Sequence, residues 1–303
     1  MGHDHGVVTA GGKHRARLAI ALAIAAAVFL MELVGALVTG SLALLADAGH
    51  VFTDMFGVAF ALVAATAAQR PPNYRRTFGW MRLEVIAAAF NALLLIGVGA
   101  FVAIEAVKRL IDPQPVEAGV MLAVAVVGMV ANFVSLRILT AGKDESINVR
   151  GAYLEVLGDL LGSAAVVAAG AVIVLTGWER ADPVAGLVVA ALILPRSLRL
   201  LRDALRILME AAPDNLDVAD VRTHLAEVPG VVDVHDVHVW TITSGVPALT
   251  AHVVVDRSTL DQCGPSSMLD QLQGCAKRCF EIEHTTFQVE PADHAGHEPG
   301  AHA

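Results

Sequence analysis

Residues 18–69 read LAIALAIAAAVFLMELVGALVTGSLALLADAGHVFTDMFGVAFALVAATAAQ and contain no Lys or Arg. A helix needs about 20 apolar residues to cross the hydrocarbon core of a bilayer, so this stretch holds two spans. The turn between them is Thr39-Gly40-Ser41, where glycine and short polar residues favour a reversal of the chain. Backbone polar groups in lipid must be satisfied within their own segment, so both spans are expected to be helices.

The composition of the whole chain agrees with a membrane protein. Of its 303 residues, 55% are hydrophobic and 17% are charged, and the mean hydropathy is +0.61. Soluble domains are about 45–50% apolar and about 25% charged. The net charge of −9 argues against a nucleic acid partner, because phosphate binding requires a basic surface. The three cysteines have no framework spacing, so disulfides do not hold the fold: Cys263, Cys275 and Cys279.

Four further apolar stretches bring the expected number of transmembrane helices to six. The expected ranges are 18–38, 42–68, 83–106, 118–141, 151–175 and 183–205. Basic residues gather before the first helix, after the second, after the fourth and after the sixth. The other side offers only Lys108, Arg109 and Arg180. Since positively charged loops stay in the cytoplasm, we expect a multi-pass protein of the cell (inner) membrane with both termini cytoplasmic. No cleavable signal peptide is recognised.

The chain divides into four parts by composition. A His-containing cytoplasmic tail, 1–17, precedes a transmembrane domain, 18–208. A polar C-terminal domain covers 209–291, and a second His-containing tail, 292–303, is expected to be disordered. β-branched runs and turn residues in the C-terminal domain predict an α+β fold with the order αββαβ. Its expected elements are 217–228, 231–243, 249–255, 266–280 and 285–289.

Ionisable residues inside the expected spans mark the candidate functional site. A charge in the bilayer costs about 2.5–3.5 kcal/mol on insertion scales. His50 and Asp54 are four apart on the second helix, and Glu155 and Asp159 are four apart on the fifth. Residues at that spacing share a helix face. No base lies near them in sequence, so two facing helices would offer one nitrogen and three oxygens to a tetrahedral divalent ion, by default zinc.

Two points remain open for this set of residues. Each side chain has an alternative role, because a lone polar residue in a membrane helix can bond a neighbouring helix or a water. The two pairs can lie at the same depth in the membrane only if the second helix extends into the cytoplasm or the fifth helix begins before residue 151. Other intramembrane polar residues are expected to bond neighbouring helices or to line a water path: Glu32, Glu84, Glu105, Asn91 and Asn132.

Several motifs resemble the cation diffusion facilitator family of metal transporters. The run SLALLADAGHVFTD, 41–54, matches the family's second-helix motif, and RGAYLEVLGDLLGS, 150–163, resembles its fifth-helix motif. VHDVHVW, 234–240, TAHVVV, 250–255, and HTTFQVE, 284–290, resemble its cytoplasmic domain. The similarity covers nearly the whole chain except the two tails.

The resemblance implies a homodimeric metal–proton antiporter that exports a divalent ion, with protons as the counter-ion. It implies a transport site at His50, Asp54, Glu155 and Asp159. It also implies a metallochaperone-like (ferredoxin-like) cytoplasmic domain that dimerises and binds regulatory metal, with four candidate ligands: His235, His252, His284 and Glu290. Zinc-selective members commonly have His where this chain has Glu155. Oxygen in place of nitrogen favours Mn²⁺, Fe²⁺ or Co²⁺ without excluding Zn²⁺ or Cd²⁺, and Zn²⁺ remains the first expectation.

Alternatives stay open for the polar residues outside the spans. The cytoplasmic histidines are ligands or hydrogen-bonded surface residues. His235 and His238 are three apart on a strand, so they are expected to point to opposite faces and not to share one site. His238 is expected to pack near Trp240. Cys275 and Cys279 form either a thiolate site or a packed helix face. The tail histidines are expected to bind metal weakly or not at all: His3, His5, His294, His297 and His302.

Three rival functions are weighed against an exporter. An intramembrane metalloenzyme needs an open coordination position and a general base, and the chain lacks HExxH. A channel would pass metal without moving protons in exchange. A metal-sensing membrane protein would need an output element, and no catalytic or DNA-binding element is attached. The expected protein is therefore a transporter with no catalytic or cofactor-binding residues, and its partners are the lipid bilayer and a second copy of the chain.

Overall fold

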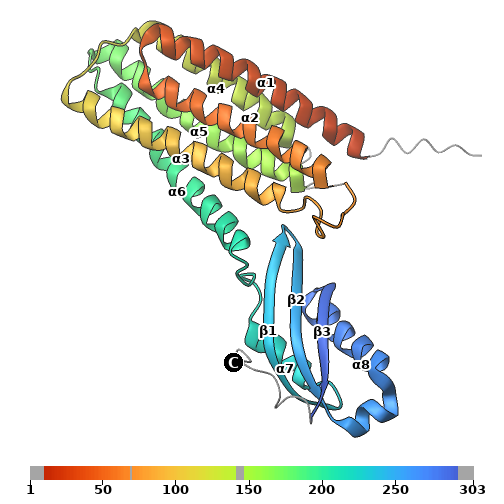
Figure 1. Cartoon of the computed structure of the whole chain (residues 1–303). Coiled ribbons are helices and arrows are strands. Elements are labelled where there is room, and N and C mark those ends of the chain that lie inside the picture. Colours follow the sequence, from red (N-terminus) through yellow and green to blue (C-terminus); the bar gives the residue numbers. More distant parts are fainter. Residues whose placement is uncertain (1–9, 69, 141–146, 293–303) are drawn as a thin grey trace, which may run out of the picture. The chain divides into compact units, whose positions relative to one another are not determined.

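The computed structural model describes residues 10–68, 70–140 and 147–292 (Figure 1). Six long helices form the membrane part, as expected. They are α1 Ala10–Thr39, α2 Leu42–Ala68, α3 Leu83–Ile111, α4 Ala118–Thr140, α5 Ile147–Thr176 and α6 Ala181–Leu208. Among the described helices, α1 and α3 to α6 are long and apolar enough to cross a membrane. The 27 residues of α2 extend about 40 Å at about 1.5 Å each, which exceeds a hydrocarbon core of about 30 Å.

Small residues let the membrane helices approach closely. A methyl group added to Gly35 of α1 would lie 2.9 Å from Val124 of α4, and one added to Gly170 of α5 would lie 3.2 Å from Leu122. Both distances are shorter than ordinary van der Waals contacts, so these backbones pack where only glycine fits. Helix α4 thus lies between α1 and α5, and the contact is lined largely by alanine.

The start of α2 is held by a side chain from α6. Asp182 is fully buried and accepts hydrogen bonds from the backbone N–H groups of Leu42 and Ala43, at 2.8 and 3.2 Å. Its carboxylate also accepts a hydrogen bond from the hydroxyl of Ser41. The first N–H groups of a helix lack intrahelical partners, so Asp182 caps α2 across 140 residues of sequence. This cap fixes the position of the helix that carries His50 and Asp54.

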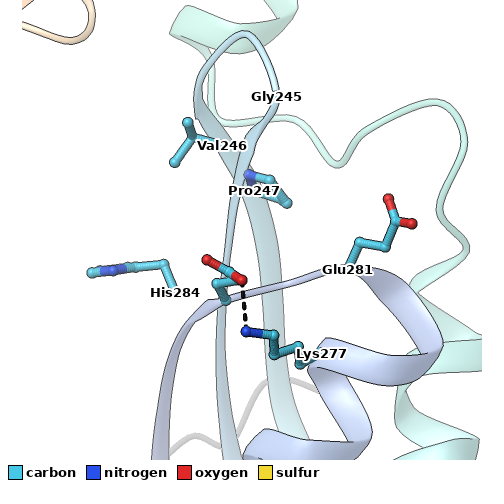
Figure 2. A pocket seen from close by; sticks show the side chains of 7 residues that line it. Gly245, Val246, Pro247, Lys277, Glu281 and His284 are labelled. Carbon is cyan, nitrogen blue, oxygen red and sulfur yellow. Dashed lines mark ion pairs between the residues drawn. The ribbon is translucent and has the colours of Figure 1, made fainter. Parts of the chain in front are cut away.

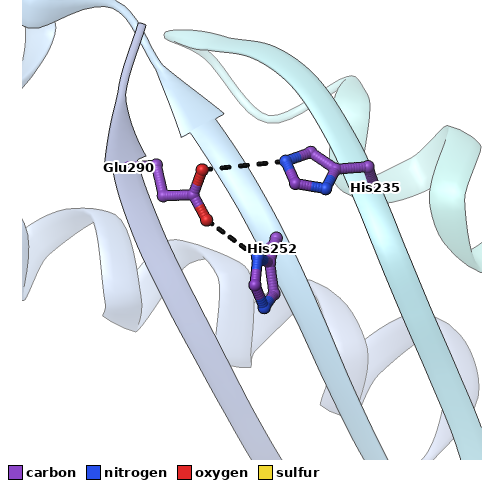
Figure 3. A group of neighbouring side chains, drawn as sticks. All are labelled: His235, His252 and Glu290. Carbon is purple, nitrogen blue, oxygen red and sulfur yellow. Dashed lines mark ion pairs between the residues drawn. The ribbon is translucent and has the colours of Figure 1, made fainter. Parts of the chain in front are cut away.

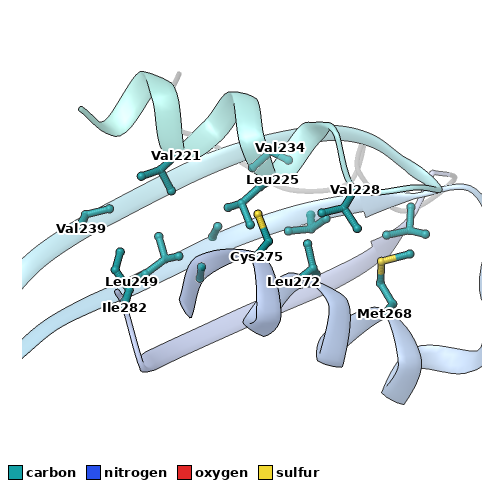
Figure 4. Packing of buried hydrophobic residues seen from close by; sticks show 14 residues of the cluster. Val221, Leu225, Val228, Val234, Val239, Leu249, Met268, Leu272, Cys275 and Ile282 are labelled. Atoms are coloured by element: carbon teal, nitrogen blue, oxygen red, sulfur yellow. The ribbon is translucent and has the colours of Figure 1, made fainter. Parts of the chain in front are cut away.

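The C-terminal domain has the predicted order αββαβ. Its elements are α7 Val218–Ala226, β1 Val231–Thr243, β2 Val246–Val255, α8 Arg257–Phe280 and β3 His284–Pro291. The sheet order is β1-β2-β3, with β1 antiparallel and β3 parallel to β2. Figure 4 shows both helices on one face of the sheet, where Leu225 of α7 and Leu272 of α8 meet the strands in a single apolar core.

Several boundaries differ from the sequence expectation, and two of them, the starts of α8 and α5, bear on the argument. Helix α8 begins at Arg257 and not at residue 266. A kink at Gly264 (φ 74°) and Pro265 separates its first turns from the part that was expected. Helix α5 begins at Ile147, four residues earlier than expected. The earlier start of α5 is one of the two ways in which the pairs on α2 and α5 were expected to reach the same depth.

A bulge interrupts β1 at the histidine motif. The register with β2 shifts between His235 and His238, and Asp236 takes a left-handed conformation with φ 51°. A bulged strand no longer alternates strictly between faces. The expectation that His235 and His238 point to opposite faces therefore fails for this part of β1.

Candidate metal centres

Three of the four expected transport ligands converge in the membrane part. Nε2 of His50 lies 3.5 Å from Oδ2 of Asp54 on the same helix and 3.3 Å from Oδ1 of Asp159 on α5. One ligand atom from each residue lies within 4.8 Å of the others. His50 and Asp159 are buried, and Asp54 is nearly so. We call His50, Asp54 and Asp159 the transport cluster; its one nitrogen and two oxygens suit a divalent ion.

The fourth expected ligand, Glu155, faces a base. Its Oε1 accepts a hydrogen bond of 3.3 Å from Nη2 of Arg196 on α6. Glu155 still borders the transport cluster, because it lines a cavity of about 260 Å³ together with Asp54 and Asp159. From the sequence, Arg196 was interpreted only as one of the basic residues that orient the sixth helix. No local pattern connects it with Glu155, which is 41 positions away.

A second group of possible ligands lies on the sheet of the C-terminal domain, where Figure 3 shows His235, His252 and Glu290 on three adjacent strands. His235 pairs opposite His252, which pairs opposite Gln288. Glu290 lies two residues beyond Gln288 and so shares its face. Nδ1 of His252 is 2.8 Å from Glu290, and Nε2 of His235 is 3.7 Å from it. We call His235, His252 and Glu290 the strand cluster.

The structure does not bring His284 to the strand cluster. His284 opens β3 opposite Ala248, six residues before Glu290, and at about 3.3 Å per residue the two are about 20 Å apart. His284 instead lines a surface pocket of about 660 Å³ with the β1–β2 turn and the end of α8 (Figure 2). There Lys277 forms a 2.8 Å ion pair with Glu283 and holds the pKa of that carboxyl below its usual value.

The bulge in β1 reveals a residue that the sequence reasoning missed. Asp236 places one oxygen 3.0 Å from Nε2 of His238 and the other 3.7 Å from Nε2 of His252. His238 therefore pairs with Asp236, where packing near Trp240 was expected. A carboxylate beside the far nitrogen of a ligand histidine orients that ring. The signal in the sequence was an acid between two histidines, in VHDVH.

The cysteines do not form a ligand group. Within the described ranges, only the transport cluster and the strand cluster bring three possible ligand residues together. Cys275 is buried, and its thiol lies 3.6 Å from the carbonyl of His224. Burial raises the pKa of the Cys275 thiol, which disfavours the thiolate that binds metal. These contacts favour a packed helix face; the tail histidines lie outside the described residues.

Comparison with known proteins places this arrangement in a family. A family model described as the cation efflux transmembrane domain matches residues 18–209, and one described as the cytoplasmic domain of cation efflux proteins matches residues 213–292. The chain belongs to the cation diffusion facilitator family of cation efflux proteins. Members of this family are transporters and not enzymes, so the metalloenzyme alternative is excluded.

Relatives of this cation diffusion facilitator are similar along most of their length. The metal cation efflux system protein CzcD of Cupriavidus metallidurans is 42% identical over 96% of this chain and 89% of its own. The zinc transporter ZitB of Escherichia coli is 43% identical over 90% and 87%. A cadmium, cobalt and zinc/H(+)-K(+) antiporter of Bacillus subtilis is 36% identical over 97% and 93%.

A solved structure also matches the C-terminal part of the chain. It is the metal-bound C-terminal domain of the CzcD transporter, which is 36% identical, covers 25% of this chain and 99% of that chain, and has a TM-score of 0.23.

Proposed function

We propose that this divalent-metal efflux transporter exports Zn²⁺ from the cytoplasm in exchange for protons, through a site formed by His50, Asp54, Asp159 and Glu155. The observation that carries the proposal is the convergence of three buried ligand atoms within 4.8 Å, on helices α2 and α5. The names of the ZitB and antiporter relatives support both zinc and proton exchange.

The ligand set also favours a second group of substrates. With Glu155 as the fourth ligand, the site offers three oxygens and one nitrogen, which is harder than a site with two histidines. Co²⁺ and Cd²⁺ have the support of the antiporter relative, and Mn²⁺ and Fe²⁺ have the support of the oxygen ligands. Zn²⁺ accepts the same donors in tetrahedral geometry, so it remains first.

Proton exchange follows from competition for the same ligands. A metal ion binds imidazole and carboxylate groups only when they are deprotonated, so binding on the cytoplasmic side releases protons. On the outer side, protons bind His50 and the carboxylates and displace the metal. Rocking of the helix bundle around a fixed site then couples proton entry to metal exit.

The C-terminal domain has a separate role in this proposal. The strand cluster binds a regulatory divalent ion, because two imidazoles and a buried carboxylate converge there from three strands. In the described state the 2.8 Å contact between His252 and Glu290 occupies two of the ligands, and metal replaces it. Two copies of the chain dimerise through this domain, and both termini face the cytoplasm.

The proposal is tested with purified protein in vesicles that contain a zinc dye and a pH dye. We expect opposed fluxes of Zn²⁺ and protons, and we expect Asp54→Asn and Asp159→Asn to abolish both. Asp112→Asn, at an exposed residue just after the end of α3, is the matched control. Near-normal flux in either cluster variant would refute the site. Zinc flux without proton movement would show a channel instead.

A further inference from the structure

A second group of buried acids lies in the membrane part, apart from the transport cluster. Glu32 of α1 is 0% exposed and Asp47 of α2 is 1% exposed. Neither oxygen of Glu32 has a hydrogen-bond partner within the described part of the chain, and the same holds for Oδ1 of Asp47. Asp47 precedes His50 by three residues, so it lies on the same face about one turn nearer the start of α2. We call Glu32 and Asp47 the buried acid pair.

The walls around the buried acid pair are shaped to admit carboxylates. A methyl group on Gly128 of α4 would lie 2.6 Å from Oε1 of Glu32, and one on Gly162 of α5 would lie 3.0 Å from Oδ1 of Asp47. Ser163 donates a hydrogen bond of 3.0 Å to Oδ2 of Asp47. Asn132 of α4 donates in turn to Ser163 at 3.2 Å. These donors reach only one of the four carboxylate oxygens.

The charged groups that face Glu32 give it no counter-charge of its own. Asp47 of α2 and Asp159 of α5 act on it electrostatically, and both are acids. His50 faces Asp47 from the same helix and is already engaged by Asp54 and Asp159. On α4, Asn132 joins this network through its hydrogen bond to Ser163 and is neutral. Among the described residues, Glu32 therefore lies in an acidic environment and makes no side-chain hydrogen bond.

A buried carboxylate in this condition must bind a cation or a proton. Burying an isolated carboxylate in an apolar interior is prohibitively costly unless it is paired or neutralised. The space around the buried acid pair is too small for a metal ion, because the close backbones at Gly128 and Gly162 leave no room for a full shell of oxygen ligands. A proton needs only one oxygen, which favours it as the occupant.

We propose that the buried acid pair is a proton site distinct from the metal ligands, with Glu32 as the residue that carries one of the exchanged protons. This inference rests on the proposed function. When a divalent ion binds the transport cluster, its charge favours loss of the Glu32 proton to water. When the ion leaves, Glu32 takes a proton again and becomes a neutral carboxylic acid. Each cycle thus moves one proton through a group that never touches the metal.

The decisive variant is Glu32→Gln, which keeps the shape of the side chain and removes the ionisable carboxyl group. In the purified full-length protein, calorimetry in buffers of different ionisation enthalpy gives the protons released per Zn²⁺ bound. We expect this number to fall by about one, because one deprotonating group is lost. Because proton release and metal affinity are linked, the Kd for Zn²⁺ is expected to rise by about tenfold, a difference of about 1.4 kcal/mol. In vesicles, zinc flux should lose part of its dependence on the pH gradient, because the metal ligands still exchange protons.

Two further variants make the test independent of folding. Gly128→Ala changes no ionisable group but pushes on Oε1 of Glu32, so it should weaken the dependence on the pH gradient in the same direction. Glu105→Gln is the control, since that acid is bonded to Arg109 and Lys108 near the end of α3 and should change neither readout.

The outcomes separate this inference from the proposed function. Wild-type proton release and wild-type pH-gradient dependence in Glu32→Gln would overturn the proton site and leave the exporter intact. Loss of zinc binding in Glu32→Gln would make Glu32 a metal ligand and also overturn it. A flux that requires K⁺ in the wild type but not in Glu32→Gln would assign the pair to a monovalent metal. Near-normal zinc flux in Asp159→Asn would instead refute the proposed function, whatever metal the strand cluster binds.

Discussion

Removal of Arg196 should tighten metal binding at the transport site. With His50 neutral, the carboxylates of Asp54, Glu155 and Asp159 carry three negative charges, and Arg196 reduces the total to two. That total balances one divalent ion. In Arg196→Gln, Glu155 loses its 3.3 Å partner and becomes available as a fourth ligand in a site with an extra negative charge. We therefore expect metal to bind more tightly and to leave more slowly.

The size of the effect follows from the geometry of the ion pair. Two unit charges 3.3 Å apart interact by about 5 kcal/mol at an effective dielectric constant of about 20. The Arg196 side chain is 55% exposed and that of Glu155 30%, so solvent screening reduces the net value to about 1 kcal/mol. This corresponds to a Kd for Zn²⁺ about fivefold lower in Arg196→Gln.

The assay is competition between the purified protein and a chromophoric chelator, with zinc-loaded vesicles to follow release. Glu155→Gln and the double variant complete a double-mutant cycle, in which the effect of Arg196→Gln should disappear once Glu155 is neutral. Arg199→Gln is the matched control, because Arg199 bonds the Pro195 carbonyl of its own helix. Weaker zinc binding in Arg196→Gln, or additive effects in the cycle, would show that Arg196 does not compete with metal for Glu155.

Three shorter predictions follow from single contacts. Asp182→Ala removes the cap from the N–H groups of Leu42 and Ala43, so the protein should lose about 1–2 kcal/mol of stability and melt at a lower temperature in detergent; an unchanged melting curve would contradict the cap. Glu155→His should shift the metal preference toward Zn²⁺ over Mn²⁺ in competition assays, and an unchanged profile would place selectivity elsewhere. At pH 8 the raised pKa of Cys275 and its burial should make it react with iodoacetamide more slowly than exposed Cys279, as mass spectrometry of labelled peptides would show; equal rates would contradict the packing.

The sequence predicts most of the fold because lipid leaves few alternatives. Long runs without charge must be helices in a bilayer, and the six ranges were found on that ground alone. The spacing of His50 and Asp54 was equally predictable, because four residues make one helical turn. The start of α8 was not, since Gly264 and Pro265 end a helix in any local analysis, yet a short helical segment precedes them here.

Contacts between distant segments could not be predicted in the same way. Asp182 caps a helix that begins 140 residues earlier, and no local pattern marks such a partner. The φ of 51° at Asp236 depends on how β1 pairs with β2, so the bulge and the position of His238 appear only in three dimensions. His284 was assigned by resemblance alone, and the extended geometry of β3 separates it from Glu290.

Arg196 is different, because a charge count could have pointed to it. A site with one His and three carboxylates carries one negative charge more than a divalent ion neutralises, whereas a site with two His and two Asp is balanced. The replacement of nitrogen by oxygen at Glu155 therefore requires a cation nearby, and in a membrane an unbalanced charge is costly. Arg196 meets that requirement from α6. In the proposed site, Glu155 and Arg196 should accordingly act as a unit, in which Glu155 is a hard ligand whose availability to the metal depends on its ion pair with Arg196.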